Sequence, residues 1–282
     1  MGSEGDFFSL LGGLTLQVTH FDVNRARCDI VHSVHPVNRL LFIREDTAGR
    51  SRICDREMEE IFPLQPGRLY FMPCFREVEV HLTPELEFLS VHFTMDLFGG
   101  TDIFQKQPVT VYSEPEFAVK AWSGLKEGRS LYAACELKGA VYRFCTRTLM
   151  QLGPEATGLL RRPEYRPLID FIAANASAST TVEQLAEFME MRPDVFSRKF
   201  SADIGITPKK FLTRFLLRRA SDLLLRPGCR VKEVAAELGF SSEFYFSRFF
   251  HKNTGIPPRQ YREFYQNREE AGQGRRKSGI AG

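Results

Sequence analysis

The sequence reads SRKFSADIGITP at Ser197–Pro208 and SRFFHKNTGIPP at Ser247–Pro258, and six of these twelve positions are identical. The match continues upstream, where the apolar residues at 182, 185, 186 and 189 correspond to those at 231, 234, 235 and 238. The offset is 49 upstream and 50 from the Ser-Arg pair onward, so one turn is a residue longer. A repeat of this kind indicates a duplicated structural unit.

Each copy of the repeat predicts two short helices joined by a turn. Apolar residues at i, i+3, i+4 and i+7 give the first helix one buried face. Ala186 and Ala235 lie within these faces, where a small side chain lets a second helix cross closely. In the second copy we expect Gly239 to end the first helix with positive φ and Ser242 to cap the next helix. In the first copy Glu190 stands in place of that glycine.

The second helix of each copy carries an arginine that we expect to point outward. Phenylalanines spaced four apart supply the buried side of these helices: Phe196, Phe200, Phe246 and Phe250. Arg198 and Arg248 each follow a serine and project away from that side. An arginine there can bond a guanine edge or a phosphate in the major groove. The alternative is a solvated surface arginine, but its occurrence in both copies of a basic segment favours DNA.

Residues 209–228, KKFLTRFLLRRASDLLLRPG, predict a single helix between the two copies. Strong helix formers fill this segment, and Pro-Gly ends it. Its apolar stripe contains Phe215, Leu216, Ala220, Leu223 and Leu224. A stiff helix holds two units at a fixed separation, and a duplex turns once every ~34 Å, so both units can enter successive major grooves.

Charge is divided unevenly along the 282 residues. Residues 161–282 hold 22 Lys and Arg against 14 Asp and Glu, whereas residues 1–160 hold 16 against 21. This split predicts an acidic N-terminal domain joined to a basic C-terminal domain that faces a polyanion. The stretch QLGPEATGLLRRPEY, with two Gly and two Pro, marks the boundary.

Apolar runs fall short of the roughly 18 residues that a membrane span requires. The start of the sequence carries acidic residues where a signal peptide has basic ones. We therefore expect a cytoplasmic protein with no membrane partner. The six cysteines form no CxxC pair, which favours reduced thiols over a zinc cluster or disulfide framework.

The segment from about Tyr165 to Tyr265 resembles the DNA-binding domain of the AraC/XylS family of bacterial transcription regulators, most specifically in VKEVAAELGFSSEFYFSRFFHKNTGIPPRQYR, Val231–Arg262. The resemblance implies two helix-turn-helix units joined by a helix. It also implies that base or backbone contacts to DNA are made by Asp194, Ser197, Arg198, Glu243, Phe244, Ser247 and Arg248. The two acidic members are unfavourable against phosphate unless each accepts a bond from a cytosine amino group.

Four stretches within residues 15–112 predict short strands separated by Pro and Gly turns: LTLQVTHFDV, RLLFIRED, RLYFMPCFREVEVHL and LEFLSVHFTM. Short strands at close spacing favour a barrel or a sandwich. This part resembles the cupin-like effector domain of the same family, notably in FPLQPGRLYFMPC.

The resulting prediction is a two-domain α+β chain. Residues 1–152 form a cupin-like β-barrel (jelly roll) with trailing helices, which binds an effector and dimerises. Residues 153–164 are a linker, residues 165–266 are an all-α DNA-binding domain of the AraC type, and residues 267–282 are a disordered tail.

A barrel of this size can hold one small ligand. Alternation in FLSVHF places Phe88, Ser90 and His92 on one face, which lines the lumen or meets solvent. Arg44 directly follows a strand and looks like the arginine that sugar-binding members of the family present to their ligand. We therefore expect a sugar or sugar derivative as effector, with a plain surface arginine as the alternative for this position.

Metal ligands and a cofactor are not expected in the N-terminal half. The N-terminal half has no HxH motif. Its histidines are His20, His32, His35, His81 and His92. The pair in HSVH is spaced three apart and precedes a proline, which fits a loop better than a facial ligand set. This pattern argues against an enzyme.

Residues 116–152 predict a long helix, with one face formed by Leu131, Cys135, Tyr142, Cys145, Leu149 and Leu152. The resemblance implies a homodimer formed by such helices. The alternative is a helix packed only on its own barrel.

We interpret the sequence as that of a sequence-specific transcription regulator. Its predicted partners are double-stranded promoter DNA, a small-molecule effector, a second copy of the chain and, for an activator, RNA polymerase. Two alternatives remain: a ligand-independent regulator whose barrel serves dimerisation or protein contact, and a cupin-type metalloenzyme fused to a DNA-binding domain.

Overall fold

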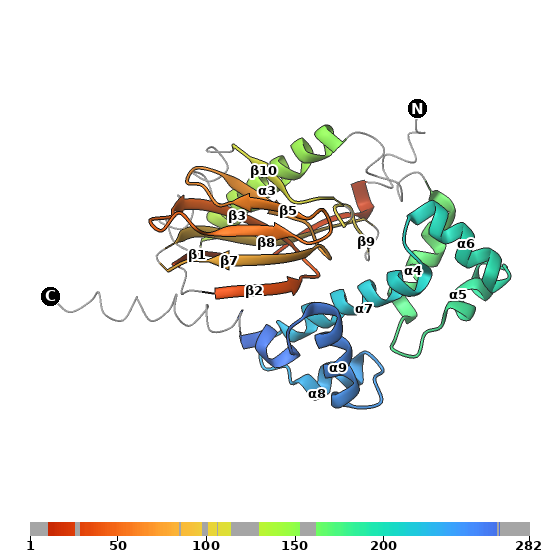
Figure 1. Cartoon of the computed structure of the whole chain (residues 1–282). Helices are drawn as coiled ribbons and strands as arrows, with labels where there is room; N and C mark the ends of the chain where they lie inside the picture. The colour runs from red at the N-terminus through yellow and green to blue at the C-terminus, as the bar shows by residue number, and fades with distance from the viewer. Residues whose placement is uncertain are drawn as a thin grey trace. The chain divides into compact units, whose positions relative to one another are not determined.

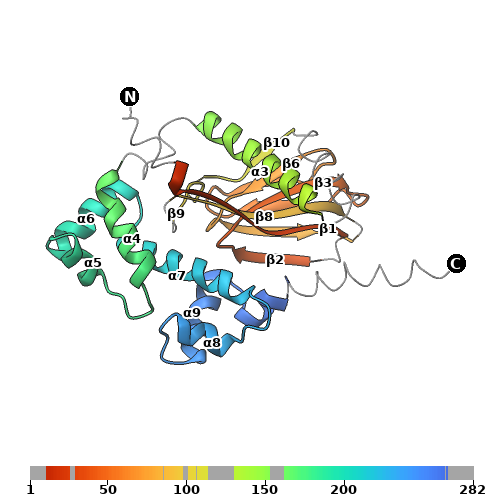
Figure 2. The ribbon, with the colours of Figure 1, turned by 180° about the vertical axis from the view of Figure 1, so that it is seen from behind.

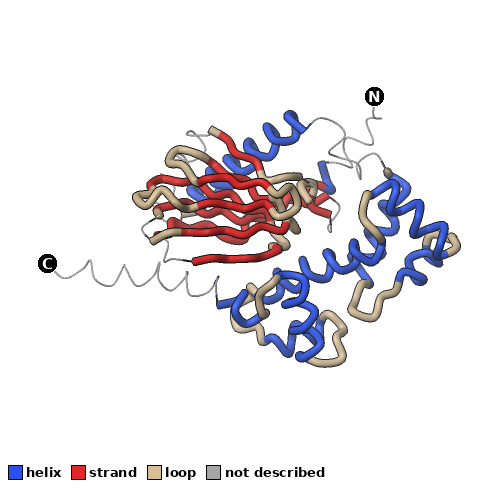
Figure 3. Tube along the Cα trace, viewed as in Figure 1, coloured by secondary structure: helices blue, strands red, loops and turns tan. Residues whose placement is uncertain are grey.

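The computed structural model describes residues 11–25, 29–84, 86–97, 101–105, 107–113, 130–152, 162–263 and 265. The chain divides into two compact units between Ala173 and Ala174. Strands belong to the first unit and a group of helices to the second (Figures 1 and 3), which confirms the two-domain α+β class. The predicted tail and residues 153–161 of the predicted linker lie outside the described residues, so those bounds stay a prediction.

The described strands of the first unit form two antiparallel sheets. Their bounds are β1 (Leu14–Arg25), β2 (Asp29–Val34), β3 (Asn38–Glu45), β4 (Arg52–Asp55), β5 (Glu60–Pro63), β6 (Leu69–Met72), β7 (Glu77–Leu82), β8 (Glu87–Leu97), β9 (Thr101–Asp102) and β10 (Thr110–Tyr112). The larger sheet has the order β1-β8-β3-β6-β10 with β9 on β8, and the smaller has the order β2-β7-β4-β5. The four predicted stretches all contain strands, and β2, β4, β5, β9 and β10 were missed.

Strand β8 separates two hydrophobic clusters. Its Leu89, Val91 and Phe93 face helix α3 (Leu131–Leu152), and they pack there with Val141 and Phe144. Figure 2 shows α3 lying across this face of the larger sheet. The opposite face of β8 carries Phe88, which packs with residues of both sheets, among them Leu41, Tyr70, Ile53 and Val80. The layer between the two sheets is therefore a second core.

Helix α3 begins within the predicted segment 116–152, of which residues 116–129 lie outside the described residues. The six residues of the predicted face divide between two sides of α3, and two of them, Leu149 and Leu152, are partly buried against the core of the larger sheet. Leu131, Cys135 and Tyr142 are exposed, whereas Cys145 is buried. The side of α3 that packs against the sheet contains Ala140, Val141 and Phe144, which leaves Leu131, Cys135 and Tyr142 accessible.

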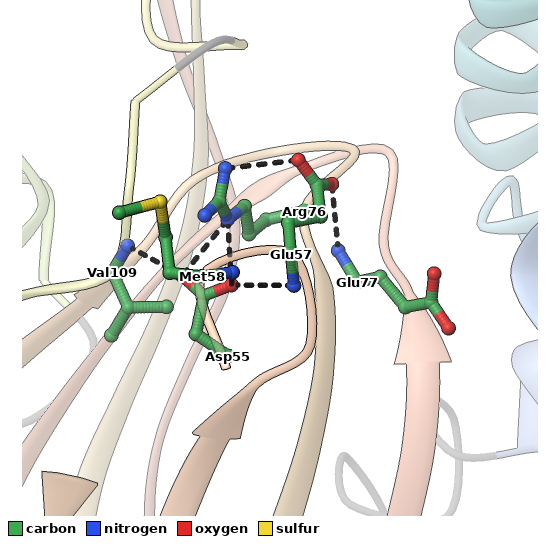
Figure 4. A network of polar contacts seen from close by, with 6 residues as sticks. All are labelled: Asp55, Glu57, Met58, Arg76, Glu77 and Val109. Atoms are coloured by element: carbon green, nitrogen blue, oxygen red, sulfur yellow. Dashed lines mark hydrogen bonds and ion pairs between the residues drawn. The ribbon is translucent and has the colours of Figure 1, made fainter. Parts of the chain in front are cut away.

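A buried ion pair ties three loops of the first unit together (Figure 4). Arg76 Nε donates to both carboxylate oxygens of Asp55, at 3.0 and 2.9 Å, and Arg76 Nη1 donates to Glu57 at 3.0 Å. Asp55 also accepts hydrogen bonds from the backbone N–H groups of Glu57, Met58 and Val109. The carboxylate thus holds the β4–β5 turn, the segment before β7 and the segment before β10.

The C-terminal helices repeat one arrangement twice. Their bounds are η2 (Pro163–Tyr165), α4 (Arg166–Asn175), α5 (Val182–Phe188), α6 (Pro193–Ile204), α7 (Pro208–Leu224), α8 (Val231–Glu237) and α9 (Glu243–Thr254). Helices α5 and α6 form the first helix-turn-helix unit, α8 and α9 form the second, and α7 runs between them (Figure 1). The predicted connecting helix is confirmed, and its five stripe residues are all buried.

None of the described helices combines the length and the apolar character that crossing a bilayer requires.

Candidate nucleic-acid interface

The turn inside each helix-turn-helix unit has the same hydrogen bonds. Met191 N–H donates to Ala186 O in the first unit, and Phe240 N–H donates to Ala235 O in the second, both at 2.9 Å. The residue before each donor adopts the left-handed conformation that such helix ends use. The repeat in the sequence therefore produces a repeat in backbone geometry.

Helix α6 has a buried side and an exposed side. Phe196 and Phe200 are buried, as their spacing predicts. Asp194 and Arg198 lie on the exposed side, with the partly exposed Ser197 between them in sequence. The three candidate contacts of the first unit thus share one accessible face, because positions i, i+3 and i+4 of a helix are neighbours.

Asp194 forms an ion pair with a residue that the sequence reading did not single out. Arg192 Nε and Nη2 donate to the two carboxylate oxygens of Asp194, at 3.2 and 3.0 Å. Both side chains are exposed at the start of α6. The pair places a guanidinium beside the acidic group, which reduces the repulsion that phosphate would otherwise meet.

Helix α9 presents aromatic side chains at its start. Phe244 and Tyr245 are 64% and 57% exposed, although large aromatic residues are usually buried. The guanidinium carbon of Arg248 lies 5.7 Å from the centroid of the Phe244 ring, a cation–π distance. Glu243 is exposed and Ser247 is partly exposed beside them. The structure therefore brings the four predicted residues of this unit onto one face.

Tyr245 and Arg192 are the residues of this surface that sequence reasoning missed. Tyr245 directly precedes Phe246, which is buried together with Phe250 four residues later. Because Tyr245 does not share this spacing, the sequence could have indicated that its side chain is exposed. Arg192 gave no comparable signal, because it precedes the helix and its pairing with Asp194 depends on the bend of the chain there.

The predicted effector residues separate into two groups. Phe88, Ser90 and His92 are buried on the face of β8 that points toward the smaller sheet. The side chain of Arg44, in contrast, is 55% exposed. Its Nη1 lies 3.0 Å from Glu87 Oε2 in an ion pair. The structure therefore does not bring Arg44 together with the other three.

Three further polar residues lie beside His92 in the layer between the sheets. His20 of β1 and Arg39 of β3 flank His92 in the strand register, and the His20 and His92 rings are 4.9 Å apart. Ser90 Oγ lies 3.1 Å from His92 Nε2, and the His35 ring lies 6.1 Å from that of His92. Burial, and then the charge of Arg39, hold the pKa of His35 well below its usual range.

Register across strands is not readable from one sequence, so this grouping of His20, His35 and Arg39 with His92 was missed. Among the described residues, no group of three or more His, Cys, Asp or Glu side chains is placed to hold a metal ion. The side chain of His32 lies outside what the structure describes.

Residues 185–263 match the protein family described as a helix-turn-helix domain. An uncharacterized helix-turn-helix transcriptional regulator of Haemophilus influenzae is 38% identical over 82 residues, which are 29% of this chain and 28% of that protein. The lactose operon transcription activator of Staphylococcus xylosus is 27% identical over 97 residues, 34% of this chain and 35% of that protein. These matches confirm the resemblance of the C-terminal part to AraC/XylS regulators, and they span about a third of each relative.

Two solved structures of ToxT from Vibrio cholerae are similar in fold to most of this chain. One, with bound unsaturated fatty acid, has a TM-score of 0.62 at 10% identity and covers 90% of this chain and 96% of that one. Another, bound to a naphthalenyl butenoic acid, has a TM-score of 0.60 at 12% identity and covers 89% and 98%. At this identity the likeness concerns the fold alone.

Proposed function

We propose that this protein is a transcription regulator of the AraC/XylS family that binds promoter DNA through α6 and α9. The observation that carries the proposal is the repeated helix-turn-helix unit, with a reading face on each second helix. Arg198 and Arg248 are the side chains best suited to a guanine edge or a phosphate. Because such a protein acts on the chromosome, the proposal includes a cytoplasmic location.

We also propose that a small-molecule effector binds in the layer between the two sheets, which a closed cupin-like barrel would enclose. Its polar end carries His20, His35, Arg39, Ser90 and His92, which can bond hydroxyl or carboxylate groups. A sugar stays the prediction from sequence, and the lactose operon activator matches only the C-terminal part, so it lends this prediction no support. The fatty acid of ToxT makes a carboxylic acid the second class to test.

The proposal includes a homodimer and, for an activator, RNA polymerase as partners. The exposed Leu131, Tyr132, Tyr142 and Met150 of α3 are large apolar side chains suited to a partner helix. Enzyme activity has no part in the proposal, since the relatives reported above are named as a regulator and an activator.

Selection of bound duplexes from a random-sequence DNA pool tests the DNA-binding proposal without a known promoter. The full chain should enrich a defined sequence. On that sequence, Arg248→Ala should weaken binding by ~1–3 kcal/mol if the arginine bonds a base. Arg50→Ala, at an exposed position between β3 and β4, is the matched control and should bind as the wild type does. Equal affinities of the wild type and Arg248→Ala would overturn the role of Arg248.

A thermal-shift comparison of the full chain with monosaccharides, disaccharides and medium-chain fatty acids tests the effector proposal. A ligand at 100 times its Kd should add about 2.7 kcal/mol to the stability of the unit that binds it. Ser90→Val should reduce that gain, because it removes the hydroxyl beside His92. A ligand that stabilises both proteins equally would show that it binds elsewhere.

A further inference from the structure

The loop between α4 and α5, which leads into the first helix-turn-helix unit, contacts the second unit directly. The backbone N–H of Ala178, in the loop between α4 and α5, donates to the carbonyl of Leu238 at 2.8 Å. Leu238 is the C-cap of α8, and the last carbonyls of a helix have no donor within the helix. The loop that leads into the first unit therefore supplies a hydrogen bond that the second unit needs.

Gly239 lies at the centre of this contact. Its φ is +74°, and a Cβ placed on it would lie only 3.0 Å from Ser177 Cβ and 3.8 Å from Ala178 N. The corresponding Glu190 of the first unit has φ +54° and nevertheless carries a side chain. The left-handed turn alone thus does not require glycine in this fold. In the second unit the close approach of Ser177 adds a steric reason.

The loop on the other side of the contact is held in place by its own hydrogen bonds. Ser177 N–H donates to Thr180 Oγ1 at 2.9 Å, and Thr180 N–H donates back to Ser177 O at 3.1 Å. Arg219 of α7 donates to the carbonyl of the buried Ala176 at 3.4 Å. The loop is therefore fixed by contacts with two other parts of the domain. It contacts the turn of the second unit through residues 177 and 178, and it contacts α7 through Ala176.

We infer that this interunit contact, residues 176–178 against residues 238 and 239, holds the two reading helices in one mutual orientation. A helix as the single link can bend and twist, whereas a second contact away from its axis restricts both motions. The inference rests on the proposed function in one respect: the fixed orientation selects DNA whose two half-sites have one spacing. Ser177 and Gly239 are accordingly positioning residues that need not touch DNA.

Three substitutions in the loop separate the contact from other effects. Ser177→Leu adds bulk against Gly239 and should open the contact. Ala178→Leu adds bulk to an exposed side chain of the same loop and is the matched control. Ser177→Ala keeps the Cβ and removes only the hydroxyl, which bonds within the loop, so it should leave the contact closed.

Amide hydrogen exchange on the full-length proteins tests whether the contact exists. The Ala178 amide should be protected in the wild type and should exchange at least about tenfold faster in Ser177→Leu, with α7 unchanged. Ser177→Ala and Ala178→Leu should keep the protection, after correction for their intrinsic exchange rates. An unprotected Ala178 amide in the wild type would overturn the inference.

Selection from the random DNA pool tests the consequence for recognition. The wild type and Ala178→Leu should enrich paired half-sites at one spacing, whereas Ser177→Leu should enrich the same half-sites at several spacings. A single spacing for Ser177→Leu, despite a faster-exchanging Ala178 amide, would overturn the positioning role. Wild-type protein that enriches no sequence would instead refute the proposed function, and the exchange experiment would still decide whether the contact forms.

Discussion

Glu190 and Gly239 occupy equivalent turns and both adopt a positive φ. Comparing substitutions at these two positions therefore measures the strain of the left-handed backbone conformation. A left-handed conformation costs an L-residue roughly 1–2 kcal/mol, and glycine avoids this cost but loses about 0.5–1 kcal/mol more in chain entropy. Glu190→Gly should therefore stabilise the C-terminal unit by up to about 1 kcal/mol. Urea unfolding followed by helical circular dichroism measures the change.

Gly239→Ala should act in the opposite direction. It introduces the same backbone strain and also forces Ser177 away, so we expect a loss of about 1–3 kcal/mol in the same unfolding measurement. A loss smaller than the backbone strain alone would show that Ser177 and its loop move away from the new methyl group at no cost in stability. That result would weaken the argument for a tight interunit contact.

His35 should make the N-terminal unit sensitive to mild acid. Its pKa lies well below the usual range in the folded state, whereas the unfolded chain has the ordinary value of about 6.5. As the pH falls below about 6.5, His35 binds a proton in the unfolded state but not in the folded state. The free energy of unfolding therefore falls, by up to about 1.4 kcal/mol per pH unit. Urea unfolding at pH 7.5 and 5.5 should show this loss.

His35→Gln is the comparison for that measurement. Glutamine does not titrate, so the difference in stability between pH 7.5 and 5.5 should shrink. An unchanged pH dependence would mean that a group other than His35 carries the effect.

Among the elements, the turn between β4 and β5 depends most on a single side chain. Asp55 and Arg76 are both buried, and Asp55 accepts three backbone hydrogen bonds in addition to the ion pair. Asp55→Ala should therefore destabilise the N-terminal unit by about 3–5 kcal/mol, because it leaves a buried guanidinium short of its main partner.

Glu57→Ala provides the matched control for Asp55→Ala. Glu57 binds the same arginine but its side chain is about half exposed, so its loss should cost less than about 1 kcal/mol. Thermal unfolding of the two variants, side by side, checks the ranking. Equal losses of stability in Asp55→Ala and Glu57→Ala would show that the buried Asp55 carboxylate stabilises the unit no more than the half-exposed Glu57 carboxylate does.

At the level of elements, the sequence was informative where structure is local. The apolar spacing of α5 and α8, the core phenylalanines of α6 and α9, and the Ser242 cap depend on neighbours within a few residues, and the structure confirms them. Strands β2, β4 and β10 were missed because each pairs with a strand distant in the sequence. Strands β5 and β9 were missed because they are too short to show an alternating pattern. Which side of α3 is buried also depends on the sheet, which packs against Ala140, Val141 and Phe144 and leaves Leu131 and Tyr142 exposed.

For the whole molecule, the uneven charge predicts strongly salt-dependent DNA binding. If each helix-turn-helix unit neutralises about three phosphates, affinity should fall roughly 10³-fold between 50 and 200 mM salt through counterion release. Fluorescence anisotropy on the selected duplex measures the slope. A weak dependence on salt would show that few of the C-terminal arginines and lysines meet the backbone.

The sequence by itself determined that the chain has a duplicated helix-turn-helix and an outward-facing arginine on the second helix of each copy, because helical periodicity and capping depend on residues close together in the chain. Only the tertiary structure decided that Phe88, Ser90 and His92 face the layer between the sheets, that His20, His35 and Arg39 join them, and that Arg44 does not. It also decided that Ser177 meets Gly239. These contacts join residues distant in sequence, and their register depends on the packing of the whole unit rather than on any local pattern.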